Sequence, residues 1–548
     1  MRKSIKIVWL LILLVSVVSV YAQNSDRKLV LFADRNYCIS GDTLWFKVFV
    51  PEELNQFGNV VHVQFETETG NLVASVTQKS SGSIAEGFIP VPDSLGTGLC
   101  YLTAFLNAQR INPNTETIGK SVYVYNRFEE RISQMEVPHA SGFENAVNGE
   151  TFCDVKIDKS TFKGRELVKC EVISNGEEVR FAIVNARIID PFSDKNDGFI
   201  NFVLNDSSAS IPPFAENNGV LISGVVRENN RVPDARNLVL LSITEEPPYF
   251  DYYYSGKDGD FHFFLQNAIG DANIILQTLG ESEREYDILP VVNQLKRTNN
   301  LRLDTLVFTA DQTKFVDDYL KNNFYSKLFN RQAVSAAAYF SMPSAFDVPF
   351  YGNPTKHIVP DEFIDLPDFK EISRELLSGF QYRTKNDETT FRLLNLDQEK
   401  FFDEQPLRLL NGIPVFKNSF FSSLASADIR YVDLVQRERV FGDLKFNGIL
   451  AVSLYNQSNS WLAQQSNVFL YERACLQPAK VPDYVNKPKV ANSEPDVRQN
   501  FLWNVLENNT SNNFSFYLSD VEGWVEISVE GITKSNKVFK TSKRIEVK

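Results

Sequence analysis

The sequence is poor in the residues that most often carry catalysis or bind metal ions. It has four histidines (His62, His139, His262 and His357) and five cysteines among 548 residues. No two cysteines form a C-x-x-C pair, which leaves a zinc ribbon or a thioredoxin-like site without support. The sequence also lacks the H-E-x-x-H, G-x-S-x-G, P-loop and G-x-G-x-x-G motifs. We therefore expect no catalytic residues, no metal site and no cofactor, and a protein that is not an enzyme.

Basic residues are outnumbered by acidic ones, 56 against 69, and long apolar runs are scarce. The formal net charge is −13, which opposes a nucleic-acid-binding function, because such proteins neutralise phosphates with lysine and arginine. Only the N-terminus is apolar over a long stretch. We therefore expect no transmembrane segment in the mature chain.

Residues 1–22 have the pattern of a secretory signal peptide. Basic residues precede an apolar run at 7–20, and Val20-Tyr21-Ala22 provides the small-residue ending expected before a cleavage site. The alternative is an uncleaved anchor, but the run of about 14 residues is shorter than the roughly 20 that span a bilayer. We expect export, with the mature protein in the periplasm and peripherally associated with the outer membrane.

Aromatic residues are abundant, with 43 Phe and 20 Tyr against 3 Met, and this composition favours strands. Between 27 and 127, short apolar or alternating runs separated by turn residues predict a β-sandwich. The predicted strands are 44–50, 61–66, 72–77, 101–106 and 121–125.

The segment Asp34-Arg35-Asn36-Tyr37-Cys38-Ile39-Ser40-Gly41-Asp42-Thr43-Leu44-Trp45-Phe46-Lys47 resembles the opening of a macroglobulin-type MG2 domain. The version is the one found in large exported proteins of Bacteroidota. The resemblance implies a sandwich over 27–127. A second macroglobulin-like sandwich is predicted over 128–215, from strand patterns at 151–157, 167–173 and 181–190.

Residues 216–282 resemble a carboxypeptidase-regulatory-like sandwich, on strand patterns at 219–226, 239–243, 261–264 and 272–276. That module is not itself a peptidase. A last β-sandwich is predicted over 476–548, where 514–520 and 523–532 alternate. The predicted fold class is mainly β: a multidomain array of macroglobulin- or immunoglobulin-like sandwiches with one α+β domain.

That α+β domain is predicted within 315–475, after a helix at 314–339. A strand ending in Asn411-Gly412, a second strand, Asp428-Ile429 and Asn447-Gly448-Ile449 resemble the plug domain of TonB-dependent outer-membrane receptors. About 90 residues follow Tyr455, too few for a large barrel whose strands each need about 9–11 residues in the membrane. The resemblance therefore implies a plug-like domain that does not act as a transporter by itself.

Together these patterns predict a non-enzymatic scaffold that docks on the periplasmic side of an outer-membrane β-barrel complex, either a TonB-dependent transporter or the barrel-assembly machinery. The alternatives are a surface or secreted adhesin-like binding module, a macroglobulin-like protease-binding protein, which lacks the thioester Cys-Gly-Glu-Gln here, and a paired-carboxylate glycosidase. The predicted partner-binding residues are Tyr249, Phe250, Tyr252, Tyr253, Tyr254, Asn411 and Gly412. Packing of the aromatic run inside its own domain is the alternative.

Export permits disulfide bonds. Cys38 with Cys100, and Cys153 with Cys170, each fall within one predicted domain and are candidate pairs. Buried free thiols are the alternative, since sequence does not fix connectivity. Cys475 is left over.

Overall fold

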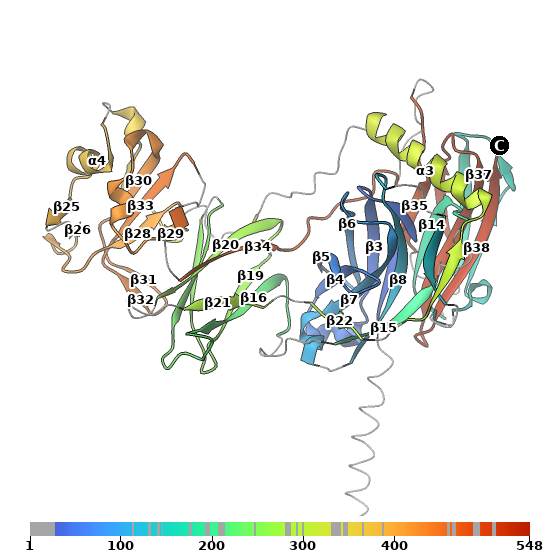
Figure 1. Ribbon diagram of the computed structural model, residues 1–548, viewed down its shortest axis with the longest axis horizontal. Helices are drawn as coiled ribbons and strands as arrows, with labels where there is room; N and C mark the ends of the chain where they lie inside the picture. Colours follow the sequence, from blue (N-terminus) through green and yellow to red (C-terminus); the bar gives the residue numbers. More distant parts are fainter. Residues whose placement is uncertain are drawn as a thin grey trace, which may run out of the picture. The chain divides into compact units, whose positions relative to one another are not determined.

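The computed structural model describes two compact units, shown in Figure 1. The described residues are 28–548 without 112–113, 130–132, 140–142, 145, 175–177, 192–197, 206–213, 246–247, 280–285, 292–293, 299–300, 330–340, 343–348, 364–365, 386–387, 457–460, 463–466, 486–493 and 507–510. The first unit takes its described residues from Met1–Val220, Asn293–Ala338 and Leu476–Lys548, and the second from Leu221–Val292 and Tyr339–Cys475. The predicted signal peptide lies outside the described residues.

The first unit begins with a strongly curved sheet in the order β5-β4-β7-β8-β1-β3-β6, with β2 added beside β8. An isolated bridge between Ser81 and Ile84 joins the two end strands at a hairpin, so that one face of the sheet encloses a core. Every strand predicted between 27 and 127 is present. The elements are β1 (Leu29–Ala33), β2 (Tyr37–Ile39), β3 (Thr43–Phe49), η1 (Glu52–Phe57), β4 (Val60–Thr67), β5 (Leu72–Lys79), β6 (Ile84–Pro90), β7 (Gly98–Leu106), η2 (Asn107–Ile111) and β8 (Thr115–Tyr125).

A second sandwich follows, built from two distant parts of the chain. One sheet has the order β10-β38-β37-β14-β35, with β12 beside β38, and the other has the order β11-β13-β36. The elements are β10 (Val147–Asn148), η4 (Gly149–Thr151), β11 (Cys153–Ile157), β12 (Thr161–Phe162), β13 (Leu167–Ser174), β14 (Val179–Ile188), β35 (Asn500–Val505), β36 (Ser511–Tyr517), β37 (Gly523–Thr533) and β38 (Val538–Val547).

This composite sandwich, made of 147–188 and 500–547, differs from the two separate sandwiches expected over 128–215 and 476–548. Strands β14 and β37 pair antiparallel from Val179 opposite Thr533 to Ile188 opposite Val525. Both segments also share one core, in which Val184 and Phe516 are buried. Period-2 alternation marks a strand and its buried face, but it does not say which other strand lies beside it.

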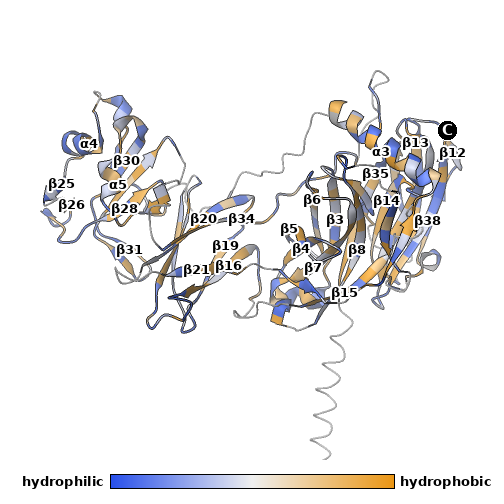
Figure 2. Cartoon of the chain, in the orientation of Figure 1, coloured by the Kyte–Doolittle hydropathy of each residue, from blue (hydrophilic) through white to orange (hydrophobic). Residues whose placement is uncertain are grey.

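The two sandwiches of the first unit pack against each other through a second apolar layer. Phe32 and Trp45 of the first sandwich share this layer with Phe181 and Trp503 of the composite one. Strand β15 (Phe199–Asn205) pairs with β8, and β22 (Lys296–Arg297) pairs with β15. In Figure 2, apolar and polar residues alternate along the strands, as sheets buried on one face require.

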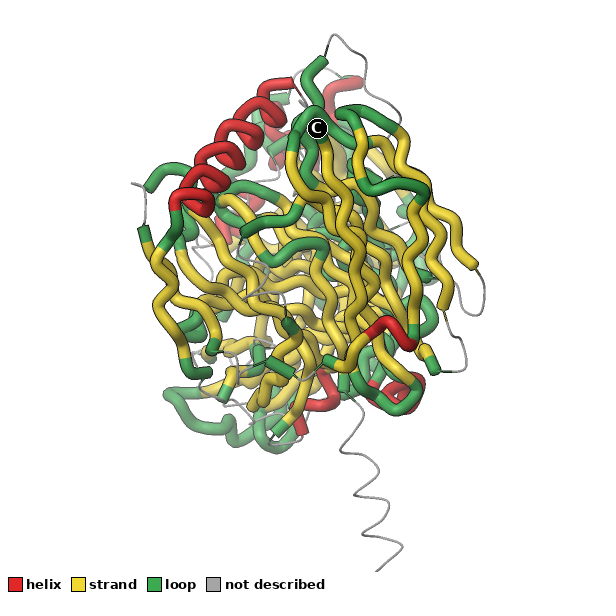
Figure 3. The backbone as a smooth tube through the Cα atoms, turned by 90° about the vertical axis from the view of Figure 1, so that its right-hand side faces the viewer, coloured by secondary structure: helices red, strands yellow, loops and turns green. Residues whose placement is uncertain are grey.

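A ribbon and a helix cover the outer side of β2 and β8. The ribbon is β9 (Gln134–Pro138) with β23 (Leu303–Val307), and the helix is α3 (Ala310–Phe329), the long helix drawn in red in Figure 3. Val316 and Tyr319 of α3 pack on Tyr37 and Tyr123. The helix begins earlier than the predicted 314, and the last part of the predicted range lies outside the described residues. No helix among the described residues is long and apolar enough to cross a bilayer.

The second unit contains a small sandwich and an α+β domain. The small sandwich has one sheet in the order β19-β16-β21 and another in the order β18-β17-β20-β34. Its strands include all four predicted between 216 and 282, and β34 joins them from beyond the α+β domain. They are β16 (Gly219–Arg227), β17 (Leu238–Ile243), β18 (Tyr249–Tyr254), β19 (Asp260–Gln266), β20 (Asp271–Leu279), β21 (Asp287–Pro290) and β34 (Val468–Ala474).

The α+β domain is built on a mixed sheet in the order β24-β30-β33-β28-β29, in which β28 runs parallel to β33. Its helices and smaller sheets enclose a separate core. The elements are β24 (Lys356–Ile358), η5 (Pro360–Glu362), α4 (Phe369–Glu375), β25 (Phe380–Lys385), β26 (Glu388–Asn395), β27 (Lys400–Phe401), β28 (Leu407–Leu410), β29 (Ile413–Pro414), α5 (Ser419–Ser422), η6 (Ser426–Asp428), β30 (Ile429–Val435), β31 (Arg439–Phe441), β32 (Leu444–Phe446) and β33 (Ile449–Leu454). The predicted fold class, mainly β with several sheets, is confirmed.

Candidate binding site

The predicted aromatic run forms strand β18, at the end of one sheet of the small sandwich. It pairs with β17 from Leu238 opposite Tyr254 to Ile243 opposite Tyr249. Phe250 is buried, and Tyr254 is 44% exposed. The run is therefore a regular strand in which Phe250 is buried, Tyr249, Tyr252 and Tyr253 are partly buried, and Tyr254 is exposed.

The side chains of β18 contact the α+β domain. The ring of Phe250 stacks on Phe350 with centroids 4.7 Å apart and lies 5.6 Å from the ring of Phe441. The Tyr252 hydroxyl accepts a hydrogen bond from the main-chain nitrogen of Asp443 at 2.7 Å. A Cβ atom on Gly442 would lie 2.0 Å from that hydroxyl oxygen, so the close approach requires glycine.

The other aromatic side chains of the run are held inside the small sandwich. Tyr253 lies edge-on to His262, with ring centroids 5.8 Å apart. The Tyr249 hydroxyl donates to Asp251 at 3.3 Å. Burial, followed by the negative charge of Asp251, raises the pKa of Tyr249, and burial raises the pKa of Asp251. Both groups are therefore more strongly protonated than in water.

The Asn411-Gly412 pair forms the turn between β28 and β29. Both residues have positive φ angles, 51° and 79°, as a tight hairpin turn requires. The Asn411 side-chain oxygen accepts a hydrogen bond from the main-chain nitrogen of Leu454 at 2.8 Å. A Cβ atom on Gly412 would lie 2.6 Å from Cβ of Pro248, just before β18.

The structure therefore brings the two predicted binding segments together, at one contact inside the second unit. A narrow cleft at this contact has a volume of about 20 Å³, room for about one water molecule. It is lined by Thr244, Pro248, Tyr351, Asn411, Gly412, Tyr431, Ala451, Val452 and Ser453. Among the described residues, Tyr249 and Tyr253 thus pack inside the small sandwich, whereas Phe250 and Tyr252 contact the α+β domain.

Beside this cleft lies a polar group that sequence reasoning missed. Asp433 is buried in strand β30 and has one partner for each carboxylate oxygen. His357 Nδ1 lies 2.6 Å from Oδ1, and the Tyr351 hydroxyl donates to Oδ2 at 2.9 Å. Burial, and then the charge of Asp433, raises the pKa of Tyr351 well above its usual value.

This arrangement fixes the orientation of a half-exposed imidazole, because the carboxylate holds Nδ1 and leaves the other edge of the ring toward the surface. His357 is far from Asp433 in sequence, so no local motif joins the two residues. The available signal was Asp433 itself, an acidic residue within the apolar run Ile429–Val435. No group of three or more His, Cys, Asp or Glu side chains suited to a metal ion occurs in the described part of the chain.

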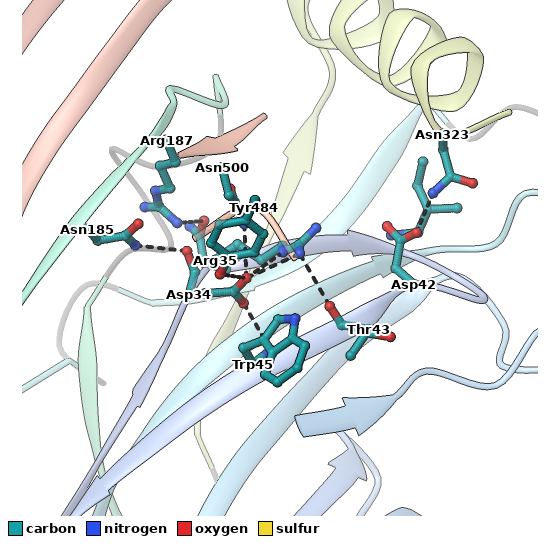
Figure 4. Close-up of polar contacts among 12 residues, drawn as sticks. Asp34, Arg35, Asp42, Thr43, Trp45, Asn185, Arg187, Asn323, Tyr484 and Asn500 are labelled. Atoms are coloured by element: carbon teal, nitrogen blue, oxygen red, sulfur yellow. Dashed lines mark hydrogen bonds and ion pairs between the residues drawn. The ribbon is translucent and has the colours of Figure 1, made fainter. Parts of the chain in front are cut away.

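The macroglobulin-like segment at 34–47 supplies the most connected polar group of the first unit, drawn in Figure 4. Asp34 Oδ2 accepts from the Tyr484 hydroxyl at 2.8 Å and from Asn500 Nδ2 at 2.9 Å, and it pairs with Arg35 at 3.1 Å. Asp34 Oδ1 accepts from the main-chain nitrogen of Trp45 at 3.1 Å. Asp34 is completely buried, so this group stabilises the fold and is closed to ligands.

Further contacts extend this Asp34 group to the composite sandwich and to α3. Asn185 Nδ2 donates to the main-chain oxygen of Asp34 at 2.8 Å. Arg35 Nη1 donates to the Tyr319 hydroxyl at 3.1 Å, and that hydroxyl donates to Asp42 at 3.3 Å. Asn323 of α3 also donates to Asp42. A short segment near the N-terminus therefore ties both sandwiches and the helix together (Figure 4).

All five cysteines lie in the described residues and are buried, and no disulfide joins them there. Cys38 and Cys100 flank β8 from opposite sides, opposite Val124 and Val122. Two strand spacings place them about 10 Å apart, beyond the roughly 7 Å that a disulfide tolerates. Cys170 lies opposite Ile157 on β11, and Cys153 lies at the other end of that strand, about 13 Å away. At these four positions the structure therefore has buried free thiols, the alternative to the two candidate disulfides.

Comparison with known proteins yields no matching family model and no matching curated protein. Among solved structures, a Salmonella alpha-2-macroglobulin variant is 8% identical over 95% of this chain, with a TM-score of 0.23. Escherichia coli alpha-2-macroglobulin activated by porcine elastase is 9% identical over 95% of this chain, with a TM-score of 0.23. Latent PorU from Porphyromonas gingivalis is 11% identical over 49% of this chain, with a TM-score of 0.16.

The chain spans 39% of the Salmonella protein and 43% of the Escherichia coli protein. It spans 34% of PorU. These TM-scores are low, so the description of the fold rests on the strand pairings above. The solved structures similar to this chain thus include bacterial alpha-2-macroglobulins, at a low level of similarity.

Proposed function

We propose that the chain is a non-enzymatic exported scaffold that docks on the periplasmic side of an outer-membrane β-barrel complex. In this proposal, the α+β domain is a plug-like module that meets the partner, and the first unit is a rigid frame. The observation that supports it most directly is the mixed sheet of the α+β domain. There the Asn411-Gly412 turn and the strands predicted from the plug-like pattern belong to one sheet with its own core.

The first unit has the properties that a frame needs. Its two sandwiches share the apolar layer around Phe32 and Trp503, and the buried Asp34 group bonds to both of them. Two sandwiches joined by a continuous apolar layer and by several buried hydrogen bonds resist relative motion. A rigid unit of this kind can support a binding module.

The α+β domain also has apolar side chains that its neighbours in the described structure do not cover. Val440 is 67% exposed, Tyr455 is 53% exposed and Phe363 is 47% exposed. Aromatic and aliphatic side chains of this kind are common anchors in protein interfaces. They replace the predicted aromatic run and the Asn411-Gly412 turn as the positions we expect to meet a partner.

The test is purification of the tagged full-length chain from detergent-solubilised cell envelope, with partners identified by mass spectrometry. We expect a large outer-membrane barrel protein, and at least fivefold less of it with the double variant Phe363→Ser and Val440→Ser. The matched control is Val481→Ser in the first unit, where the side chain is 72% exposed. Recovery of no barrel protein with the unaltered chain would overturn the proposal.

The adhesin and protease-binding alternatives give different results in the same cells. An adhesin is cleaved by protease added to intact cells, whereas a periplasmic scaffold is protected until the outer membrane is opened. A protease-binding protein forms a stable complex with added protease, which we do not expect here. Either of those outcomes would replace the proposed function.

A further inference from the structure

Strand β36 lies at one edge of the composite sandwich. It is the last strand of the sheet β11-β13-β36 and pairs antiparallel with β13 over Ser511–Tyr517. On its other side, the main-chain groups of residues 513–516 have no hydrogen-bond partner in the described part of the chain. Arg498 Nη2 donates to the carbonyl oxygen of Tyr517 at 3.3 Å and bounds this open segment. The edge therefore presents unpaired N–H and C=O groups, a template for a further strand.

The side chains of the segment do not protect this edge. Proteins usually protect an edge strand with charged residues, prolines or bulges. Residues 513–517 contain no charged residue and no proline, and their pairing with β13 has no shift of register. A groove of about 530 Å³ crosses the sheet beside the segment and is lined by residues 156–158, 169–171 and 513–515. The sheet is thus hollowed next to the edge, which leaves room for the side chains of an added strand.

The opposite edge of the same sheet is protected. Strand β11 carries the exposed residues Asp154 and Lys156. In addition, Lys543 Nζ donates to the carbonyl oxygen of Val155 at 3.2 Å, so a lysine from β38 occupies a main-chain acceptor of β11. Charges and a lysine contact are ordinary ways of preventing strand addition. The two edges of one small sheet therefore differ, and only that of β36 suits pairing.

We propose that β36 is a dimerisation strand, which pairs antiparallel with β36 of a second copy of this chain around a two-fold axis at Ser515. Because side chains alternate between the faces of a sheet, residues that face the core must lie opposite residues that face the core. Ser515 then lies opposite its own counterpart, Phe514 lies opposite Phe516 of the second copy, and Asn513 lies opposite Tyr517. The sheet would continue through six strands from one copy to the other.

The residues of β36 favour a second copy over a strand from a different protein. In the proposed register the strand complements itself, because aromatic residues oppose aromatic residues and no like charges meet. The segment also carries no charge that would select an oppositely charged partner. Five paired residues are fewer than the roughly 20–30 per side of a stable interface, so we expect a reversible dimer with a dissociation constant on the order of 10 µM.

The test is light scattering after size-exclusion chromatography of the purified full-length mature chain, loaded at about 1 to 200 µM to bracket that dissociation constant. We expect the mass to rise from one chain toward two. Ser515→Lys and Ser515→Glu should each weaken the dimer about tenfold or more, because like charges then meet at the axis. An equal mixture of the two variants should restore it, because the charges that meet are then opposite.

The matched control is Ser542→Lys, which places the same charge at an exposed serine of β38 in the other sheet. It should leave the dimer unchanged. Ser515→Cys should form a disulfide-linked dimer on mild oxidation, because opposite Cβ atoms lie about 4.5–5.5 Å apart, whereas Ser542→Cys should not. The native cysteines are buried, and substitutions at exposed serines should leave the melting temperature of the dilute monomer unchanged.

Three results would each overturn the proposal. They are a monomer at every concentration, a dimer that Ser515→Lys does not weaken, and an equal mixture of the two charged variants that stays monomeric. A strand from a different protein as the true occupant gives the first result. The inference concerns the first unit and does not rest on the proposed function. Recovery of a barrel protein is measured separately, so the two proposals fail independently.

Discussion

The side-chain amide of Gln477 bonds both main-chain groups of Phe88. Its Nε2 donates to the carbonyl oxygen of Phe88 at 2.8 Å, and its Oε1 accepts from the nitrogen of Phe88 at 2.9 Å. Strand β6 pairs with β3 on its other side, so one glutamine takes the place of a neighbouring strand. An open strand edge is a site for unwanted pairing between molecules, and this contact closes it.

The rest of that edge is closed in the same manner. Ser81 exchanges two main-chain hydrogen bonds with Ile84, and the Gln78 amide donates to the carbonyl oxygen of Glu86. Pro90 ends the strand without a main-chain donor. Edge protection at β6 therefore combines a main-chain contact at Ser81 with two glutamine side chains, Gln78 and Gln477.

Gln477→Ala should destabilise the first unit by about 1–3 kcal/mol, because it leaves the main-chain groups of Phe88 without their partner. It should also promote self-association through the opened edge. Denaturant unfolding and light scattering of concentrated samples measure the two effects. Gln266→Ala, at an exposed position of β19, serves as the control and should change neither.

Asp34→Ala should destabilise the first unit by about 3–5 kcal/mol, since it removes a completely buried carboxylate and leaves the Arg35 guanidinium, which is only 18% exposed, without its nearest carboxylate. Urea unfolding followed by far-UV circular dichroism should show the transition of the first unit moving to lower urea, with that of the second unit unchanged. Asp93→Ala removes an exposed ion pair with Arg127 and should cost less than about 1 kcal/mol. Equal effects of the two variants would contradict the assigned role of Asp34.

Stability should fall with rising pH above about 10, the ordinary pKa of tyrosine. Burial raises the pKa of Tyr351, Tyr484 and Tyr37, so these hydroxyls stay protonated in the fold after the same groups ionise in the unfolded chain. The unfolded state then binds fewer protons, and the free energy of unfolding decreases with pH. Absorbance at 295 nm should show a late group of tyrosines that ionises together with unfolding.

The variant Asp433→Asn should change this titration at one residue. Removing the carboxylate charge should lower the pKa of Tyr351, because that charge is the second cause of its increase after burial. One tyrosine should therefore ionise at lower pH than before, while the other late-ionising tyrosines are unchanged. Simple ionisation of every tyrosine near pH 10 in the folded protein would count against this account.

The cysteines should react with a thiol reagent only after unfolding, and without prior reduction. Burial raises the pKa of Cys100 and Cys153 to about 12 and that of Cys170 to about 11, so little thiolate is present at neutral pH. We expect Cys38, Cys100, Cys153 and Cys170 all to be labelled in denaturant, as counted by intact mass. Protection of two of them until a reductant is added would establish a disulfide and contradict the structure.

Local features of the fold could be predicted from sequence because their cause is local. Alternating burial identified strands such as β37, and the Asn411-Gly412 turn was visible because only a few residues accept its backbone angles. The start of α3 has a similar local signal. Thr309 and Gln312 bond to each other's main-chain nitrogen, the pattern of a capping box, and this places the helix start at Ala310.

Long-range features could not be predicted, because no local pattern records them. The pairing of β14 with β37 joins residues about 350 positions apart, far beyond any window of periodicity. The His357 and Asp433 contact likewise depends on the order of strands in the mixed sheet. The aromatic run at 249–254 illustrates the same limit. Its composition is compatible with an exposed binding surface and with packing, and only its contacts with the α+β domain show that Phe250 and Tyr252 are packed.

The composite sandwich also determines when the chain can finish folding. Residues 147–188 are synthesised early, but β14 remains without β35 and β37 until residues 500–533 have followed. The last strand of the intervening second unit ends earlier, at Ala474. A product that stops before β35 therefore keeps an unclosed sheet, the kind of exposed strand edge that leads to aggregation.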